Sequence, residues 1–379
     1  KRSQIMDDFE SVLKQYKKNS PKIKISNLSF IGQPGNDIVI SGIRMHGVNV
    51  NDPEKIAEDF NTALKEAQML TVFLQMAFVP FEDCTFRTGP AKFYIPENRH
   101  YEGRYRLKVE DILENRDFPR KVVMASAPVD AEKFVSADLS EEYTYIMGNP
   151  TVYSIPLDCY VAKNIDNLLM VGKKASYSSL ASTSAGRMAV NITGGEAMGI
   201  TAAWCYLNDL TPAGLIEAPE QTIKEYQGLL KRAGLILEDF DIPNPNEDHW
   251  AWNSVKVLTE YGLVAGGLNN DYLFDVESYQ EHFVTLLINL IVKAAPQKYS
   301  LEMDSRIRAY ANEEVLTGEI AAEILLKAAD IPFEQGNAFQ TAKDHKLFPG
   351  EVLERISPNK AVTLDSVYVM TVNFIDEIK

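Results

Sequence analysis

The spacing of apolar residues over the first 80 positions predicts a helix, a set of strands and a second, longer helix. Within residues 7–17, apolar side chains recur at helical spacing at Phe9, Val12, Leu13 and Tyr16. Residues 23–50 alternate short β-rich runs with Gly and Asn, which is typical of successive strands and tight turns. Asp52 can then cap a helix that has Pro53 at its first position and continues to about Phe78.

The pattern changes after this helix. Two β-like pieces, 84–95 and 103–109, flank a charged cluster at residues 99–104. Residues 153–206 then combine a short strand at 153–155, an apolar run at 168–171, a Ser-rich loop and a helix that is dominated by Ala, Gly and Thr from 185 to 203. A helix with so few bulky side chains must lie close to a flat group or to another backbone.

The last third of the chain has a different organisation. Residues 239–248, DFDIPNPNED, have the acidic, Pro- and Asn-rich content of a linker. Beyond them the sequence from Val255 is echoed from Phe339 and, more weakly, from Ile307. A repeat of about 40 residues fits small helical units that bury a core by stacking. We therefore predict an α+β region at 1–238, a linker at 239–248 and an all-α, three-repeat domain at 249–379.

The composition is that of a folded protein that does not bind nucleic acid. The 379 residues are 45% hydrophobic and 24% charged, and the formal net charge of −15 would be repelled by a phosphate backbone. No run of about 18 apolar residues predicts a membrane span, and the first residues lack the apolar segment of an export signal. Cys84, Cys159 and Cys205 are scattered without C-x-x-C spacing. The sequence thus indicates buried thiols, with neither a disulfide framework nor a metal site.

The segment from Ile155 to Trp204 resembles the C-terminal, flavin-contacting segment of the FAD-dependent oxidoreductase family. The family's Leu-Leu-Val-Ala-Gly-Arg strand end is represented by Leu-Leu-Met-Val-Gly-Lys, in which Lys173 keeps the charge of the Arg but lacks its planar fork of donors. The resemblance implies that backbone at Gly172 approaches the flavin ring and that a helix opening near residues 182–184 presents N–H groups to its electron-rich edge. The cofactor-binding residues that it implies are Gly172, Lys173, Ser182, Thr183, Ser184, Arg187 and Gly195. A tightly packed Ala/Gly helix without a cofactor is the alternative.

The segment from Phe93 to Pro119 supports the same family. It resembles an Arg-rich segment that ends Gly-x-Tyr-x-Leu-x-x-x-Asp-x-Leu, matched here by Gly103, Tyr105, Leu107, Asp111 and Leu113. In relatives this strand borders the substrate side of the flavin, which makes Arg99, His100 and Arg104 candidate substrate-binding residues. A solvated face with local ion pairs is the other interpretation. No catalytic acid or base is assigned, and the resemblance covers about residues 20–210.

A dinucleotide fingerprint does not occur in this chain. No strand is followed by G-x-G-x-x-G with an acidic residue about 20 positions later. Family members carry that fingerprint N-terminal to the region seen here, where it holds the pyrophosphate and ribose of FAD. We therefore expect a portion of a flavin-dependent oxidoreductase, with FAD as the cofactor of the full-length protein and weak or absent FAD binding and activity by this chain alone.

The C-terminal third resembles S-layer homology (SLH) repeats of bacterial surface proteins. The resemblance rests on Asp248-His249-Trp250-Ala251 and on Leu347-Phe348-Pro349-Gly350. The family's Thr-Arg-Ala-Glu element corresponds to Tyr279–His282, to Thr317–Glu319 and to Thr363–Ser366, and none of the three copies has the Arg. Because an anionic cell-wall polymer needs a cation to hold it, this loss argues against wall binding.

An alternative function follows from the SLH resemblance. The chain would be a cell-surface or scaffold protein in which the oxidoreductase region is catalytically dead and the repeats contact cell wall or protein. Its location would be the cell surface if the SLH resemblance holds and an export signal lies upstream, and the cytoplasm otherwise.

Overall fold

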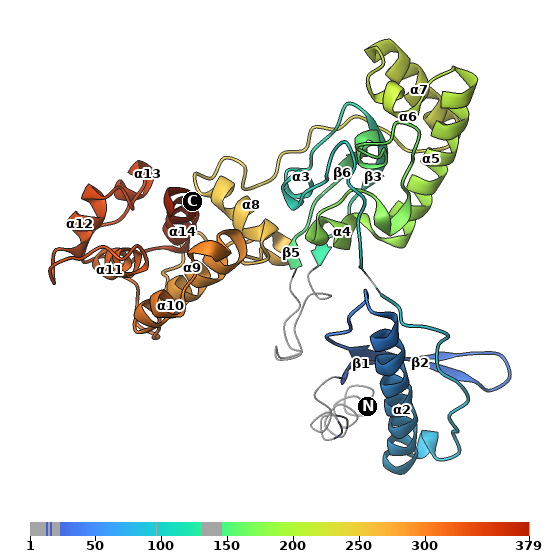
Figure 1. The fold of residues 1–379 in the computed structure, drawn as a ribbon, viewed down its shortest axis with the longest axis horizontal. Helices are drawn as coiled ribbons and strands as arrows, with labels where there is room; N and C mark the ends of the chain where they lie inside the picture. Colours follow the sequence, from blue (N-terminus) through green and yellow to red (C-terminus); the bar gives the residue numbers. More distant parts are fainter. Residues whose placement is uncertain (1–12, 14–15, 17–22, 96, 131–145, 379) are drawn as a thin grey trace. The chain divides into compact units, whose positions relative to one another are not determined.

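The computed structural model describes residues 13, 16, 23–95, 97–130 and 146–378 (Figure 1). The chain divides into two compact units: unit 1 comprises Lys1–Asn98 and Lys133–Thr144, and unit 2 comprises Arg99–Glu132 and Tyr145–Lys379. Helices and short antiparallel sheets occur together, which agrees with the predicted α+β class.

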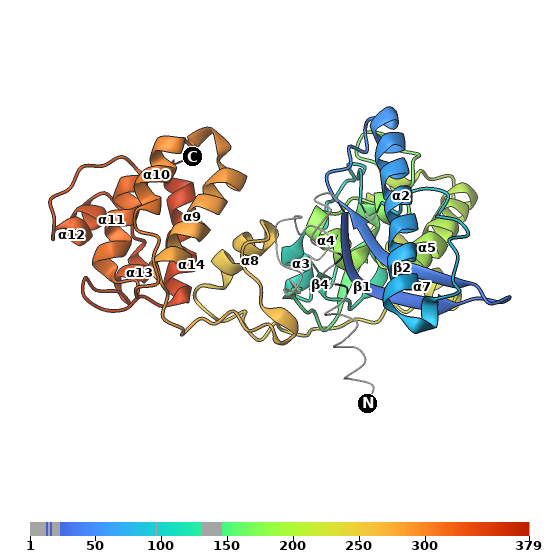
Figure 2. The same cartoon turned by 90° about the horizontal axis from the view of Figure 1, so that it is seen from below.

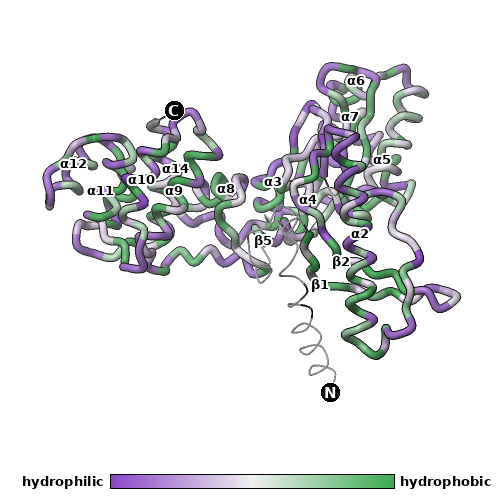
Figure 3. Tube along the Cα trace, turned by 60° about the horizontal axis from the view of Figure 1, so that its bottom comes forward, coloured by the Kyte–Doolittle hydropathy of each residue, from purple (hydrophilic) through white to green (hydrophobic). Residues whose placement is uncertain are grey.

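Unit 1 is a β-hairpin packed on a long helix. Strand β1 (Ile23–Gly32) pairs antiparallel with β2 (Ile38–Met45), and helix α2 (Pro53–Ala77) begins after Asp52, whose side chain accepts from two backbone N–H groups. Figures 2 and 3 show α2 beside the hairpin. Leu70 and Leu74 of α2 are buried together with Ile25 and Leu13. The predicted strands and helix are therefore confirmed.

Two further predictions for unit 1 are not confirmed. Residues 84–95 follow a short 3-10 helix, η1 (Val79–Phe81), and contain no strand, so the β-like piece predicted there is wrong. Side chains such as Thr88 and Arg87 make local or hairpin contacts in place of a ladder. The predicted helix at 7–17 lies outside the described residues except for Leu13 and Tyr16, which are helical.

The first part of unit 2 joins two small sheets to a layer of helices. Strand β3 pairs with β6, and β4 pairs with β5, both antiparallel. The strand at 153–155 is confirmed by β6, whereas the piece at 103–109 forms only isolated bridges, at Gly103 and Leu107. The elements are α3 (Val109–Leu113), β3 (Lys121–Ala125), β4 (Val129–Asp130), β5 (Ile146–Gly148), β6 (Tyr153–Pro156), η3 (Leu157–Cys159), η4 (Gly172–Lys174), α4 (Ser179–Ala185), α5 (Met188–Leu207), α6 (Pro212–Ile216) and α7 (Glu220–Arg232).

The C-terminal part of unit 2 is helical, with three short extended segments at its centre. Ser278 N–H donates to Val362 O (2.8 Å), Val362 N–H to Leu316 O (2.9 Å), and Leu316 N–H to Ser278 O (2.8 Å), which closes a ring. Each segment leads into a helix, α9, α11 or α14. The three-repeat organisation itself stays a prediction. The elements are α8 (Trp252–Glu260), η5 (Gly267–Asn269), α9 (Gln280–Ala294), η6 (Pro296–Lys298), α10 (Leu301–Arg308), α11 (Gly318–Ala328), α12 (Ala338–Asp344), α13 (Gly350–Leu353) and α14 (Leu364–Ile378).

Residues 239–248 form an irregular segment, here called the strap, that is hydrogen-bonded to the first part of unit 2. The buried Lys121 ammonium donates to Glu238 O (2.9 Å) and to the Asp239 carboxylate (2.8 Å). Farther along, the buried Asn244 amide donates to Leu113 O (2.6 Å). The composition is that of a linker, but these bonds tie the segment down, and the domain boundaries at 238 and 249 stay predictions.

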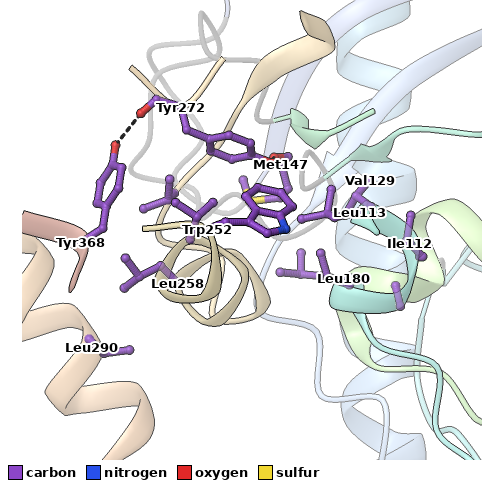
Figure 4. Packing of buried hydrophobic residues seen from close by; sticks show 14 of the residues in the cluster. Ile112, Leu113, Val129, Met147, Leu180, Trp252, Leu258, Tyr272, Leu290 and Tyr368 are labelled. Carbon is purple, nitrogen blue, oxygen red and sulfur yellow. Dashed lines mark hydrogen bonds between the residues drawn. The ribbon is translucent and has the colours of Figure 1, made fainter. Parts of the chain in front are cut away.

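One hydrophobic core continues through unit 2 from Leu107 to Ile375. In Figure 4, Trp252 of α8 lies beside Leu113 of α3, and Tyr272 lies above it. Helix α8 therefore joins the helical C-terminal part to the sheets by direct apolar packing.

An ion-pair cluster at the same junction gives unit 2 an acid-sensitive contact. Glu114, at the end of α3, pairs with Lys256 of α8 and with Arg116. Burial acts to raise the pKa of Glu114, but the hydrogen bonds from both cations outweigh it and the pKa is lowered. A lowered carboxylate pKa adds stability above the unfolded-state pKa, and that stability is lost as the pH falls through the folded-state pKa.

We therefore expect the urea midpoint of the protein to fall as the pH drops below about 4.5, and to fall less in Glu114→Gln. Fluorescence of Trp204, Trp250 and Trp252 reports this transition because all three lie in unit 2. Glu220→Gln, which removes a pair with Lys224 on the exposed face of α7, is the control and should leave the acid slope unchanged. An identical slope in Glu114→Gln and the parent chain would contradict the assignment.

Candidate functional site

The turn at residues 172–175 contains Gly172, for which the family resemblance implies an approach to the flavin ring. Gly172 has a φ of +70°, and a Cβ built on it would meet nothing within 4 Å. A positive φ at an open position suits glycine, since any other residue would be strained. The preceding Val171 is 49% exposed. The turn therefore presents bare backbone and an apolar side chain to the outside.

A buried tyrosine pair supports this turn. Met170 N–H donates to Tyr160 O (2.7 Å), and Tyr177 O–H donates to the Tyr160 hydroxyl (2.8 Å). A Cβ on Gly194 of α5 would lie 2.9 Å from that hydroxyl, so α5 approaches the Tyr160 ring through its glycine. The close contact expected of the small-residue helix is thus made, on one face, to a side chain of the same chain. Sequence analysis did not single out Gly194 or Tyr160.

The helix that follows begins later than the sequence predicts. Ser182, Thr183 and Ser184 lie in the last turn of the short helix α4, and α5 begins at Met188 with Arg187 as its N-cap. The prediction of a helix opening at 182–184 is therefore wrong. Gly186 is the C-cap of α4, and its N–H donates to Ser182 O. The chain turns there before α5 starts.

The hydroxyls of this last turn already have partners. Thr183 Oγ1 donates to Leu180 O (2.7 Å) and accepts from Asp130 N–H (2.9 Å). Ser184 Oγ bonds the Tyr153 hydroxyl (2.7 Å) and Ala127 O. Ser182 Oγ donates to Ser179 O (2.7 Å). These contacts indicate that Thr183 and Ser184 hold β4 and β6 against α4, and their cofactor role stays a prediction.

Two cations lie at the same junction. Arg187 Nη2 is 3.3 Å from the Asp130 carboxylate, and the side chain of Arg187 is 41% exposed. Lys173, in the η4 turn, is partly exposed, and η4 packs against α5. Asp130 is a residue that sequence analysis missed, because its strand has only two residues and no motif marks it.

The outer face of α5 is apolar and exposed. Met188 and Ile192 are 79% and 65% exposed, and a Cβ on Gly195 would meet nothing within 4 Å. These residues recur at helical spacing, so they lie on one face, opposite the buried Gly194, Ala197 and Met198. Gly195 thus lies where a flat group could approach the helix.

The predicted substrate residues border the η4 turn. Tyr101 N–H donates to Lys174 O (3.0 Å), and His100 Nδ1 is 3.0 Å from Ala175 O. The structure therefore brings the segment of Arg99 and His100 beside the turn of Gly172, although about 70 residues separate them in sequence. Arg104 instead pairs with Asp166 (2.9 Å) and Glu217 (3.0 Å), which favours a structural role for it.

The Gly-x-Tyr-x-Leu-x-x-x-Asp-x-Leu motif is explained by packing. A Cβ on Gly103 would lie 2.7 Å from Ser176 Cβ, and Leu107 and Leu113 are fully buried. Tyr105 O–H donates to both oxygens of Asp111 (2.8 Å each). Burial raises the pKa of Asp111, against the opposing effect of these donors. The motif residues therefore have a structural role next to the candidate site.

Two of the three cysteines, Cys159 and Cys205, are buried as predicted, whereas Cys84 is half-buried. Burial raises the pKa of Cys159, which is completely enclosed, and also that of Cys205. Cys205 lines a shallow depression at the C-terminal end of α5 together with Leu169, Tyr206 and Thr211. This depression contains none of the predicted site residues. Within residues 23–95, 97–130 and 146–378, no group of three metal-ligating side chains occurs, and no helix has the length and apolar content to cross a membrane.

The structure thus places the irregular segment of His100 beside the turn of Gly172, and this turn packs against α5. Comparison with known proteins then defines the class of the chain. The family model described as "FAD dependent oxidoreductase" matches residues 4–230. Since the match covers more than half of the chain, the protein belongs to the FAD-dependent oxidoreductase family. No curated protein and no solved structure matches the chain.

Proposed function

We propose that this chain forms the flavin-capping and substrate-side part of an FAD-dependent oxidoreductase. The observation that carries the proposal is the contact between residues 100–101 and the turn at 172–175, which joins the two segments with family resemblance. The proposal of FAD as the cofactor is supported by membership of the FAD-dependent oxidoreductase family. When bound, the flavin supplies the group that accepts or donates a hydride.

The residues of the chain fit the ring half of FAD. Gly172 and Gly195 leave room for a flat ring, and Val171 and Ile192 offer exposed apolar surface for it to cover. Lys173 in the turn and Arg187 at the start of α5 would supply positive charge for the anionic edge of the reduced ring. Arg99 and His100 would orient a polar substrate, while Ser182, Thr183, Ser184 and Arg104 would keep these elements in place.

The pyrophosphate half has no such fit. The sequence contains no G-x-G-x-x-G loop to cradle phosphates. We infer that this chain holds the isoalloxazine ring alone and binds it weakly. FMN and FAD, which share that ring, should therefore bind with similar dissociation constants, in roughly the millimolar range.

The test is a titration of the chain with FMN and with FAD, followed by flavin fluorescence, in the parent chain and in Gly172→Val. We expect the variant to bind about tenfold more weakly, which corresponds to about 1.4 kcal/mol, because the new side chain fills the space that the ring needs. The control is Gly336→Val, since Gly336 also has a positive φ (+80°) and open surroundings but lies in the C-terminal helical part. Both substitutions strain the backbone equally.

The outcomes separate the alternatives. Equal weakening by the two substitutions would show that backbone strain, and not loss of the site, is measured. Tight binding of FAD with weak binding of FMN would contradict a grip on the ring alone. The absence of saturable binding of either flavin would favour the scaffold function.

For the C-terminal helices we propose an SLH-like module. The closed ring of Ser278, Leu316 and Val362 supports it, because the three copies of the Thr-Arg-Ala-Glu element begin one residue after these positions. The Arg position is occupied by Gln280, Gly318 and Leu364. Trp250 donates to Asp365 (2.8 Å) and stacks under Arg355 (4.2 Å to the ring centroid), so it is committed to internal contacts. These features favour contacts within the chain over binding of wall polymer.

A further inference from the structure

The loop at residues 266–272, in the helical part of unit 2, holds the strand β5 by a dense set of hydrogen bonds. Met147 O accepts from Gly266 N–H (2.9 Å) and from the Tyr272 hydroxyl (3.0 Å). The Asn270 side chain accepts from Asn149 N–H (2.7 Å) and donates to Asn149 O (2.8 Å). Both polar groups of the Asn149 peptide backbone are thus satisfied by one side chain.

The loop at 266–272 also packs closely against β5. A Cβ on Gly148 would lie 2.9 Å from the Tyr272 hydroxyl and 3.3 Å from Asn270 Oδ1. Tyr272 is fully buried, and Asn270 has the left-handed backbone (φ +54°) that aims its amide at β5. The loop therefore fixes the position of β5 from three consecutive residues, 147–149.

From β5 the contacts continue to the candidate flavin site. Strand β5 pairs with β4, with Val129 opposite Gly148 and Asp130 opposite Ile146. Asp130 N–H donates to Thr183 Oγ1 (2.9 Å), and the Asp130 carboxylate pairs with Arg187 (3.3 Å). Strand β4 thus connects the loop at 266–272 with the junction between α4 and α5.

We propose that Tyr272 and Asn270 are positioning residues for this junction: the C-terminal helical part clamps the paired strands β4 and β5 and thereby places Thr183 and Arg187. The effect of this clamp on flavin binding rests on the proposed function, but the existence of the clamp does not. The C-terminal part would then be a component of the oxidoreductase site, in contrast to an independent anchor on a flexible linker.

The first measurement is amide hydrogen exchange at Asp130 in the full chain. Tyr272→Phe keeps the buried ring and removes one hydrogen bond to β5, so we expect exchange at Asp130 to become about fivefold faster. Asn270→Gly keeps the left-handed backbone and removes two bonds, so its effect should be larger. Tyr368→Phe is the matched control: its hydroxyl donates to Tyr272 O (3.0 Å, drawn in Figure 4), and this residue is also buried, but that hydrogen bond does not go to β5. We expect exchange at Asp130 to be unchanged in this variant.

The second measurement is FMN affinity of the same variants. Faster exchange together with an FMN dissociation constant raised about threefold or more in Tyr272→Phe, and unchanged in Tyr368→Phe, would support the positioning role. Unchanged exchange at Asp130 would overturn the clamp, whatever the flavin data. Altered exchange with unaltered FMN affinity would overturn the positioning role. If the parent chain binds no FMN, the proposed function fails, and the exchange data still decide whether the clamp exists.

Discussion

Replacing Asp111 by alanine should destabilise unit 2 by about 3 kcal/mol, among the largest effects of a single substitution in this chain. Asp111 is 1% exposed and accepts from Lys108 N–H (2.9 Å), from Tyr105 O–H and from Arg116. Its removal leaves the first turn of α3 without its acceptor and Tyr105 without a partner for its hydroxyl. The free energy of unfolding is measured by urea titration, with tryptophan fluorescence as the signal.

Two further variants show which part of the loss is due to charge and which to hydrogen bonding. Asp111→Asn keeps the shape and an acceptor for Lys108 N–H, so it should cost about half as much. Tyr105→Phe removes only one donor and should cost about 1 kcal/mol. A change below about 1 kcal/mol in Asp111→Ala would contradict the structural explanation of the family motif, because the carboxylate would then not hold α3 in place.

Local sequence signals predicted the elements that local chemistry determines. Asp52 and Pro53 mark the start of α2 because a capping carboxylate and a proline at the first turn act within four residues. The cofactor role of Gly172 was implied by family resemblance and stays a prediction; the structure adds that this residue has a positive φ. The three-repeat register of the C-terminal part was predicted because each copy has the sequence of its own turn and helix, and it stays a prediction.

Contacts between distant residues were not predictable in this way. The strap at 239–248 has the composition of a linker, yet Lys121, more than 100 positions earlier, fixes it. Asp130 and Tyr160 support the candidate site through partners far along the chain, and no spacing in the sequence marks them. Family resemblance implied a helix start at 182–184, whereas a turn at Gly186 divides the small residues there into α4 and α5.

In the SLH-like module that we propose, Gly318 stands at the Arg position of the second copy, and its surroundings leave little room for a side chain. A Cβ at this position would lie 2.5 Å from Ser357 O and 2.9 Å from Ser357 C, which are backbone atoms of the third repeat unit. Glu319 N–H is bonded to Pro358 O (2.9 Å), so a shift of this backbone would also disturb that hydrogen bond. A residue with a Cβ, including Arg, therefore requires the backbone near Ser357 to move.

Gly318→Ala should accordingly lower the stability of unit 2 by about 2–3 kcal/mol, although alanine is the better helix former. Gly350→Ala is the matched control, since Gly350 is likewise the first residue of a helix in the same part of the chain but has no atom within 4 Å of a built Cβ. That substitution should be neutral or slightly stabilising. Urea midpoints of the two variants measure the difference. Equal midpoints would mean that the ring yields to a side chain, and then the loss of the Arg would have no steric cause and wall binding by an opened ring would have to be reconsidered.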